Sequence, residues 1–254
     1  MRLLFTILFI FVGTYCIAYS DPYNILKKSV TNCRTQKQLN ERLKHKFKDF
    51  SLEEVSPVQR KLDFGFSQTR YWLEVSGRPE MYKIFIVTSS SSDSIVLGTI
   101  EEMQGDERLE NYIEINWGIN NYLSQHKAYY GYDLTKDEFK NQLSKRLIYG
   151  FNCSEDGDYN PPEAIQTLNS INNNNYDTLA IQLRQISPEL QAYGVYGLLK
   201  LKEKGNEIKP KDLELIEYLR KRNTKINSCV GCLTGYMVTL DEIIKRIERS
   251  SDQK

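Results

Sequence analysis

The fold is decided by residues 69–88, which read TRYWLEVSGRPEMYKIFIVT. Apolar and polar residues alternate over 69–75, a period of two that is typical of a β-strand with one buried face. Residues 76–79 are turn formers, and residues 81–88 are apolar on both faces. The stretch therefore predicts two antiparallel strands, because the connection is too short for a crossover helix. We expect the second strand to lie at the centre of its sheet.

The same period of two predicts three further strands, at residues 62–66, 95–100 and 113–117. The connections at 89–94 and 104–106 are again short and rich in turn formers. The sheet is therefore expected to be an antiparallel meander, in which each strand pairs with the next one along the chain.

One amphipathic helix is predicted before the strands of this sheet in the sequence and one after them. The apolar face of the first helix collects Leu39, Leu43, Phe47 and Phe50. The second begins at a capping box, Thr135 and Glu138, with Leu134 and Phe139 as a hydrophobic staple, and extends to Leu147. Such helices need an apolar surface to cover. The expected fold is α+β: an antiparallel β-meander covered by one or two helices, followed by an all-α module of short antiparallel helices.

Turn formers gather at residues 152–162, which predicts a domain boundary close to Glu155. The expected division is a signal peptide at 1–20, an α+β sheet domain at 21–155 and a helical module at 156–254. Past the boundary the apolar period becomes 3.6, so helices and no strands are expected. Their predicted first residues or N-caps are Pro162, Asn175, Ser187, Pro210 and Thr239.

Within this module, residues 176–205 read as a helix, then Ser-Pro-Glu, then LQAYGVYGLLKL. The segment resembles a HEAT-type helical hairpin, a form of helical repeat. The resemblance implies α-solenoid packing and a protein-binding surface, and it brings no catalytic residue. Only one clear unit and a partial second are present, so the helices are expected to lean on the sheet domain. Gly194 and Gly197 predict the close approach of a neighbouring helix.

The first twenty residues predict a secretory signal peptide. Arg2 precedes an apolar run over residues 3–12, and the small residues Ala18 and Ser20 suit cleavage before Asp21. The mature protein would be secreted or periplasmic. No later apolar segment approaches the ~20 residues that a membrane span needs, so no membrane span is expected after leader removal.

The charges of the chain are balanced. The sequence has 34 Lys and Arg against 33 Asp and Glu, and removing Arg2 with the leader leaves 33 of each. Neither half carries the basic excess that binding to a phosphate backbone requires. Nucleic acid is therefore not expected as a partner.

The mature chain has four cysteines, Cys33, Cys153, Cys229 and Cys232, and an even number in an exported protein favours disulfides. Three connectivities are open, and we prefer Cys229–Cys232 with Cys33–Cys153. The alternative is a thiol–disulfide oxidoreductase site at Cys229 and Cys232. The absence of a predicted strand before this C-x-x-C motif favours a structural bond. Two further zinc ligands at suitable spacing are missing, so no metal or cofactor is expected.

A polar and aromatic stretch at residues 120–132 follows the last predicted strand. It supplies a candidate ligand cleft, made of Tyr122, His126, Tyr129, Tyr130 and Tyr132. Rings and amides could line a site for a sugar or a peptide. The competing interpretation, which we favour, is that these tyrosines occupy half-buried sheet edges and loops. His126 is also the candidate base of a hydrolase, whereas His45 lies among lysines on a solvated helix face.

No nucleophile elbow, Walker loop or dinucleotide-binding glycine pattern occurs in the sequence, so no catalytic residue is assigned. The sequence favours an exported, non-enzymatic protein that binds a macromolecule, with a protein or a surface as its partner. The alternatives are the oxidoreductase at Cys229 and Cys232, and a small-ligand binder with a Tyr-rich cleft.

Overall fold

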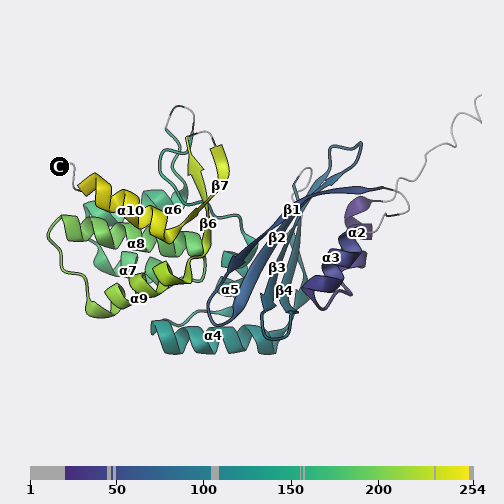
Figure 1. Ribbon diagram of the computed structural model, residues 1–254, viewed down its shortest axis with the longest axis horizontal. Coiled ribbons are helices and arrows are strands. Elements are labelled where there is room, and N and C mark those ends of the chain that lie inside the picture. The colour runs from purple at the N-terminus through teal and green to yellow at the C-terminus, as the bar shows by residue number, and fades with distance from the viewer. Residues whose placement is uncertain are drawn as a thin grey trace, which may run out of the picture.

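The computed structural model describes residues 21–44, 47, 50–103, 109–154, 156, 158–231 and 233–251. The predicted signal peptide, His45, the 104–106 turn, Glu155 and Cys232 lie outside them. The protein has an α+β fold, with an antiparallel five-stranded sheet and its helices followed by a mostly helical region (Figure 1). The predicted fold class is confirmed.

The sheet is a meander with the strand order β1-β2-β3-β4-β5. Its strands are β1 (Leu52–Lys61), β2 (Phe66–Val75), β3 (Met81–Ser89), β4 (Ser94–Glu102) and β5 (Leu109–Glu114). The strand predicted to be central is the middle strand β3, which is buried along almost its whole length. The register pairs Tyr71 with Ile84 and Ile84 with Ile100, so one face of the sheet is continuously apolar.

Two predicted strands are corrected. Residues 62–65 are the turn between β1 and β2, with positive φ angles at Phe64 and Gly65. Their alternation is misleading because the apolar side chains of a turn can also be buried, as that of Leu62 is. The strand before this turn, β1, was missed because its residues are mostly polar. The strand predicted at 113–117 ends at Glu114, where a helix follows.

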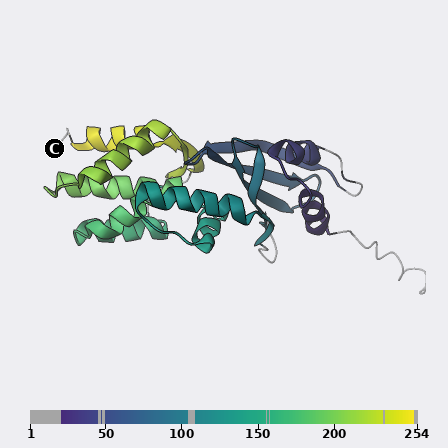
Figure 2. The ribbon, with the colours of Figure 1, turned by 90° about the horizontal axis from the view of Figure 1, so that it is seen from below.

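Helices cover both faces of the sheet. One face packs against α2 (Pro22–Val30), which the sequence did not predict, and α3 (Gln36–Lys44). The other packs against α4 (Asn116–Tyr130) and α5 (Lys136–Ser144), and the predicted capping box of α5 is present. The predicted helix ends at Ser144, before Leu147. Figures 1 and 2 show α4 alongside both the sheet and the helical region.

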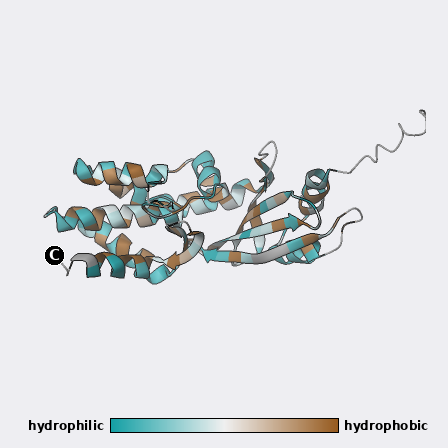
Figure 3. Ribbon diagram, turned by 90° about the horizontal axis from the view of Figure 1, so that it is seen from above, coloured by the Kyte–Doolittle hydropathy of each residue, from teal (hydrophilic) through white to brown (hydrophobic). Residues whose placement is uncertain are grey.

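The helical region consists of α6 (Pro162–Asn172), α7 (Tyr176–Leu183), α8 (Pro188–Glu203), α9 (Pro210–Arg222) and α10 (Leu240–Ser251). The predicted helix starts agree with these bounds. Apolar residues recur among hydrophilic ones along each helix (Figure 3), and α8 is buried over most of its length. A Cβ on Gly194 would overlap the backbone of Leu183, and one on Gly197 would overlap Leu179. The predicted close approach is confirmed, and α7 and α8 run antiparallel.

The expectation that strands are absent after the boundary is wrong. A hairpin of β6 (Lys225–Val230) and β7 (Leu233–Thr239) lies between α9 and α10. Cys229 of the C-x-x-C motif lies in β6, close to the turn, where Gly231 has a φ of +57°. A helical period dominates the flanking sequence, and it concealed two short strands.

Candidate functional site

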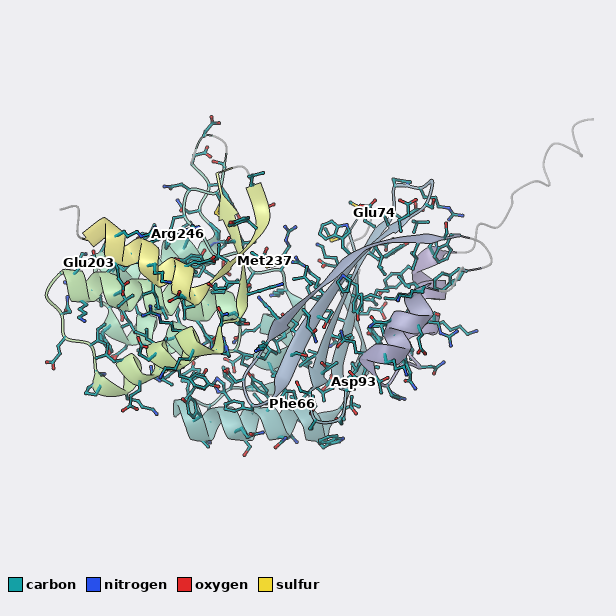
Figure 4. The ribbon with its side chains drawn as sticks, in the orientation of Figure 1. Phe66, Glu74, Asp93, Glu203, Met237 and Arg246 are labelled. Carbon is teal, nitrogen blue, oxygen red and sulfur yellow. A yellow bond between two sulfur atoms is a disulfide. The ribbon has the colours of Figure 1, made fainter. Side chains whose placement is uncertain are left out.

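The β6–β7 hairpin forms a wall between two hollows of the molecule. Successive side chains of a strand point to opposite faces. Ser228 and Val238 line a hollow on the side of α8 and α10, whereas Asn227 and Met237 line one on the side of the sheet. In Figure 4 Met237 projects from β7 towards the sheet, and Arg246 lies on α10.

The larger hollow, which we name the disulfide pocket, has a volume of ≈ 390 Å³. Its walls come from the segment after α5, from α8, from the hairpin and from α10. They are Tyr149, Gly150, Phe151, Tyr196, Lys200, Ser228, Cys229, Gly231, Val238, Ile243, Arg246 and Ile247. A largely apolar hollow of this volume with a few polar groups is typical of a binding site.

A disulfide between Cys153 and Cys229 lies beside this pocket, with a Cα–Cα distance of 5.5 Å. The preferred pairing from the sequence is therefore wrong, and Cys33 is a free, buried thiol. The cause is a backbone contact between Tyr149 and Ser228, which carries Cys153 towards β6. Burial raises the pKa of the Cys33 thiol, which keeps it protonated.

Three aromatic rings form one wall of the pocket. The ring of Phe151 lies 4.5 Å from that of Tyr196 and 6.0 Å from that of Tyr149. Behind them, the hydroxyl of Tyr193 accepts a hydrogen bond from the Gly150 amide and donates to backbone oxygen, each at 3.0 Å. Burial raises the pKa of Tyr149, so its hydroxyl stays neutral. The wall is fixed in place and uncharged.

The charge of the pocket is at its rim. Lys200 forms an ion pair with Glu203 at 2.8 Å. Arg246 is exposed and forms no hydrogen bond or ion pair with any residue that the structure describes. The free guanidinium can bind a carboxylate in a bidentate manner. The pocket can therefore hold an apolar group that carries an acid.

Apolar side chains also lie exposed on the hairpin and on the loop that the disulfide joins to it. Tyr236 is 54% exposed, Leu233 66% and Tyr159 54%. Tyr236 shares a strand face with Val238, which lines the pocket. Several large apolar groups exposed around one pocket are typical of a protein–protein contact surface.

The residues of the predicted tyrosine cleft do not face one space. Tyr122, His126 and Tyr130 lie on the buried face of α4 and are 0%, 0% and 1% exposed. His126 stacks on the Tyr130 ring at 4.5 Å, and burial lowers the pKa of its imidazole. Tyr129 is partly exposed and its ring lies 4.7 Å from that of Tyr218, whereas Tyr132 is half-buried.

Sequence reasoning missed the aromatic wall of the disulfide pocket. No pattern in the sequence marks Tyr149 or Phe151 as part of a site. Tyr196 belongs to a helix whose apolar face is predicted to lie in the core. The available signal was local: Gly150 stands between two aromatic residues and close to Cys153. A Cβ on Gly150 would overlap the Cys229 sulfur, so this position admits no larger residue without movement of the disulfide.

In comparisons with known proteins, no protein family, no curated protein and no solved structure matches the chain. Among the residues that the structure describes, no helix is long and apolar enough to cross a bilayer. The described residues also contain no group of three or more His, Cys, Asp and Glu side chains arranged to hold a metal ion.

Proposed function

We propose that this chain is an exported, non-enzymatic binding protein and that the disulfide pocket receives an apolar side chain of a protein partner. The observation that carries the proposal is the ≈ 390 Å³ pocket with its aromatic wall, on a hairpin that also exposes the side chains of Tyr236 and Leu233. A partner's apolar anchor seated in such a pocket is the usual centre of a protein interface.

Two further features support export and protein binding. The predicted signal peptide and the Cys153–Cys229 disulfide are both typical of proteins in an oxidising compartment. The resemblance of residues 176–205 to a HEAT-type hairpin implies a protein-binding surface. By contrast, an oxidoreductase at the C-x-x-C motif requires a bond between its own two cysteines, and Cys229 is bonded to Cys153 instead.

The rim of the pocket sets the chemistry of the partner. Tyr149, Phe151 and Ile247 offer apolar contact, and Arg246 offers a free cation at the edge. A partner segment with an aromatic or aliphatic residue close to an Asp or Glu would satisfy both. The apolar residue would supply most of the free energy of binding, and the acid would fix the orientation.

A random peptide library displayed on phage tests this proposal. Selection on the wild-type protein should enrich peptides in which an apolar residue stands near an acid. The variant Arg246→Glu should weaken binding of a selected peptide roughly tenfold or more, because it replaces a charge-assisted hydrogen bond with repulsion. Lys245→Glu is the matched control, since Lys245 is an exposed neighbour on α10 outside the pocket wall, and it should bind as the wild type does.

The proposal fails if selection enriches no common sequence, or if the selected peptides bind Arg246→Glu and Tyr196→Ala as tightly as the wild type. Binding of a free aromatic acid, without binding of peptides that carry the same group, would support the small-ligand alternative instead.

A further inference from the structure

The smaller hollow, between the sheet and the β6–β7 hairpin, holds an excess of positive charge. We name it the sheet pocket, and its charged residues are Arg60, Arg70, Lys145, Arg146 and Glu189. Four cations against one carboxylate leave a local charge of +3 in a molecule whose total is +1. The charge balance of the whole chain therefore hides a concentrated basic site.

Strand register brings these cations together. Arg70 on β2 pairs with Val58 on β1 and with Phe85 on β3, and Lys83 pairs with Trp72 one step further along. Alternation places Arg70, Trp72 and Lys83 on the same face of the sheet. Arg146, which follows α5, reaches the same face and lies 5.8 Å from the Trp72 ring.

Among the described residues that line the sheet pocket, the carboxylate is that of Glu189, and both of its oxygens accept hydrogen bonds. Glu189 is buried and accepts hydrogen bonds from Arg60, from the backbone N–H of Asn227 at 2.9 Å and from the Ser187 hydroxyl at 2.7 Å. Arg60 also donates to Gln68 at 2.6 Å. This pair joins the sheet to α8, and among the described residues Arg60 is the arginine with which Glu189 forms an ion pair.

Arg70 and Arg146 have no such partner. Neither forms a hydrogen bond or an ion pair with any residue in the described part of the chain, and Nε of Arg146 is buried without an acceptor. Burial, and then the charges of Arg146 and Arg60, lower the pKa of Arg70. Burial also lowers the pKa of Lys83, although Glu101 opposes the shift from 3.7 Å away. The repulsion between these positive charges raises the free energy of the pocket when no anion is bound in it.

From this geometry we infer that the sheet pocket binds a carboxylate group, held between the guanidinium groups of Arg70 and Arg146. The hollow has a volume of ≈ 30 Å³, and this small size favours a compact, planar anionic group over a bulkier tetrahedral one. A planar carboxylate has two oxygens, whereas a phosphate has four. The exposed Lys145 places the hollow at the surface, so the rest of the acid can extend into solvent.

The carboxylate could belong to a small acid or to a peptide, and titration calorimetry of the purified protein distinguishes these sources. Acetate tests the small acid, and triglycine against its C-terminal amide tests a carboxylate on a peptide. Phosphate and chloride at equal ionic strength are the comparison anions. Binding of acetate or of triglycine, but not of the amide, is expected.

Two variants locate the bound group. Arg70→Gln and Arg146→Gln should each weaken carboxylate binding by roughly 10- to 100-fold, because each removes a charge-assisted hydrogen bond. Arg249→Gln, which removes an exposed arginine of α10 outside both pockets, should bind the carboxylate as the wild type does. In a buffer that contains only chloride, Arg146→Gln should melt at the same temperature as the wild type or higher, since it relieves repulsion.

The inference is overturned if no carboxylate binds more tightly than chloride, or if only phosphate binds. It is also overturned if the Arg70 and Arg146 variants bind as the wild type does. A melting temperature of Arg146→Gln below that of the wild type in chloride alone would also overturn it, because Arg146 would then stabilise the fold without a bound anion. None of these results depends on the partner proposed for the disulfide pocket.

Discussion

Single residues set the distances between elements in this protein, and Gly194 and Gly197 on α8 are the clearest case. A Cβ on Gly194 would meet backbone atoms of Leu183, whereas one on Gly197 would meet the end of the Leu179 side chain. Backbone cannot yield without moving α7, but a leucine can change its rotamer. Two glycines in one helix are therefore expected to differ in their tolerance of alanine.

We predict that Gly194→Ala lowers the free energy of unfolding by about 1–3 kcal/mol through overpacking. Gly197→Ala should change it by less than about 1 kcal/mol, because the higher helix propensity of alanine offsets a small repacking cost. Urea unfolding followed by circular dichroism measures both, and each variant is the control of the other. Equal losses, or a larger loss at Gly197, would contradict the reasoning.

The residue-scale features that sequence predicted are those with local causes. The capping box at Thr135 and Glu138 depends on residues of one helix. The close packing at Gly194 depends on the adjacent helix α7. The guanidinium pair of Arg70 and Arg146 depends on strand register and on a segment 76 positions later in the sequence. No local pattern in the sequence marks such a pair.

Among the elements, the β6–β7 hairpin contributes residues to both pockets and lies between them. The Cys153–Cys229 disulfide, whose cysteines are 76 residues apart, ties this hairpin to the segment between α5 and α6. The C-x-x-C spacing favours a local bond between Cys229 and Cys232, because no pattern in the sequence indicates that Cys153 lies beside Cys229. Secondary structure was predictable where an apolar period extended over a whole element. The prediction missed the strands β1, β6 and β7, where no such period is present.

Removing this disulfide should destabilise the protein. We predict that the double variant Cys153→Ala with Cys229→Ala loses about 2–4 kcal/mol of unfolding free energy, because the unfolded chain loses a constraint on a long loop. A reductant should destabilise the wild type and leave the double variant unchanged. Peptide mapping under non-reducing conditions provides the independent check, and a Cys229–Cys232 bond there would contradict the structure.

At the scale of the whole molecule, a buried ion pair joins the sheet to the helical region. Asp63, in the turn after β1, receives hydrogen bonds from Arg222 at the end of α9, from Tyr218 at 3.1 Å and from Tyr130 at 3.0 Å. The Asp63 side chain is 0% exposed and that of Arg222 is 7% exposed. Burial acts to lower the pKa of Arg222, but the charge and hydrogen bond of Asp63, together with the nearby Tyr130 and Tyr122 hydroxyls, raise the pKa overall.

We predict that Asp63→Asn lowers the free energy of unfolding by about 3–5 kcal/mol, because it leaves the Arg222 charge buried without its counterion. The matched control is Asp241→Asn, which removes a more exposed partner of Arg220 on the same helix and should cost about 1 kcal/mol or less. Adding Arg222→Met to Asp63→Asn should recover part of the loss, since no uncompensated charge then remains. Calorimetric unfolding of the four proteins is the measurement. If Asp63→Asn costs no more than Asp241→Asn, or if the second substitution adds to the loss, the ion pair does not hold the two parts of the chain together.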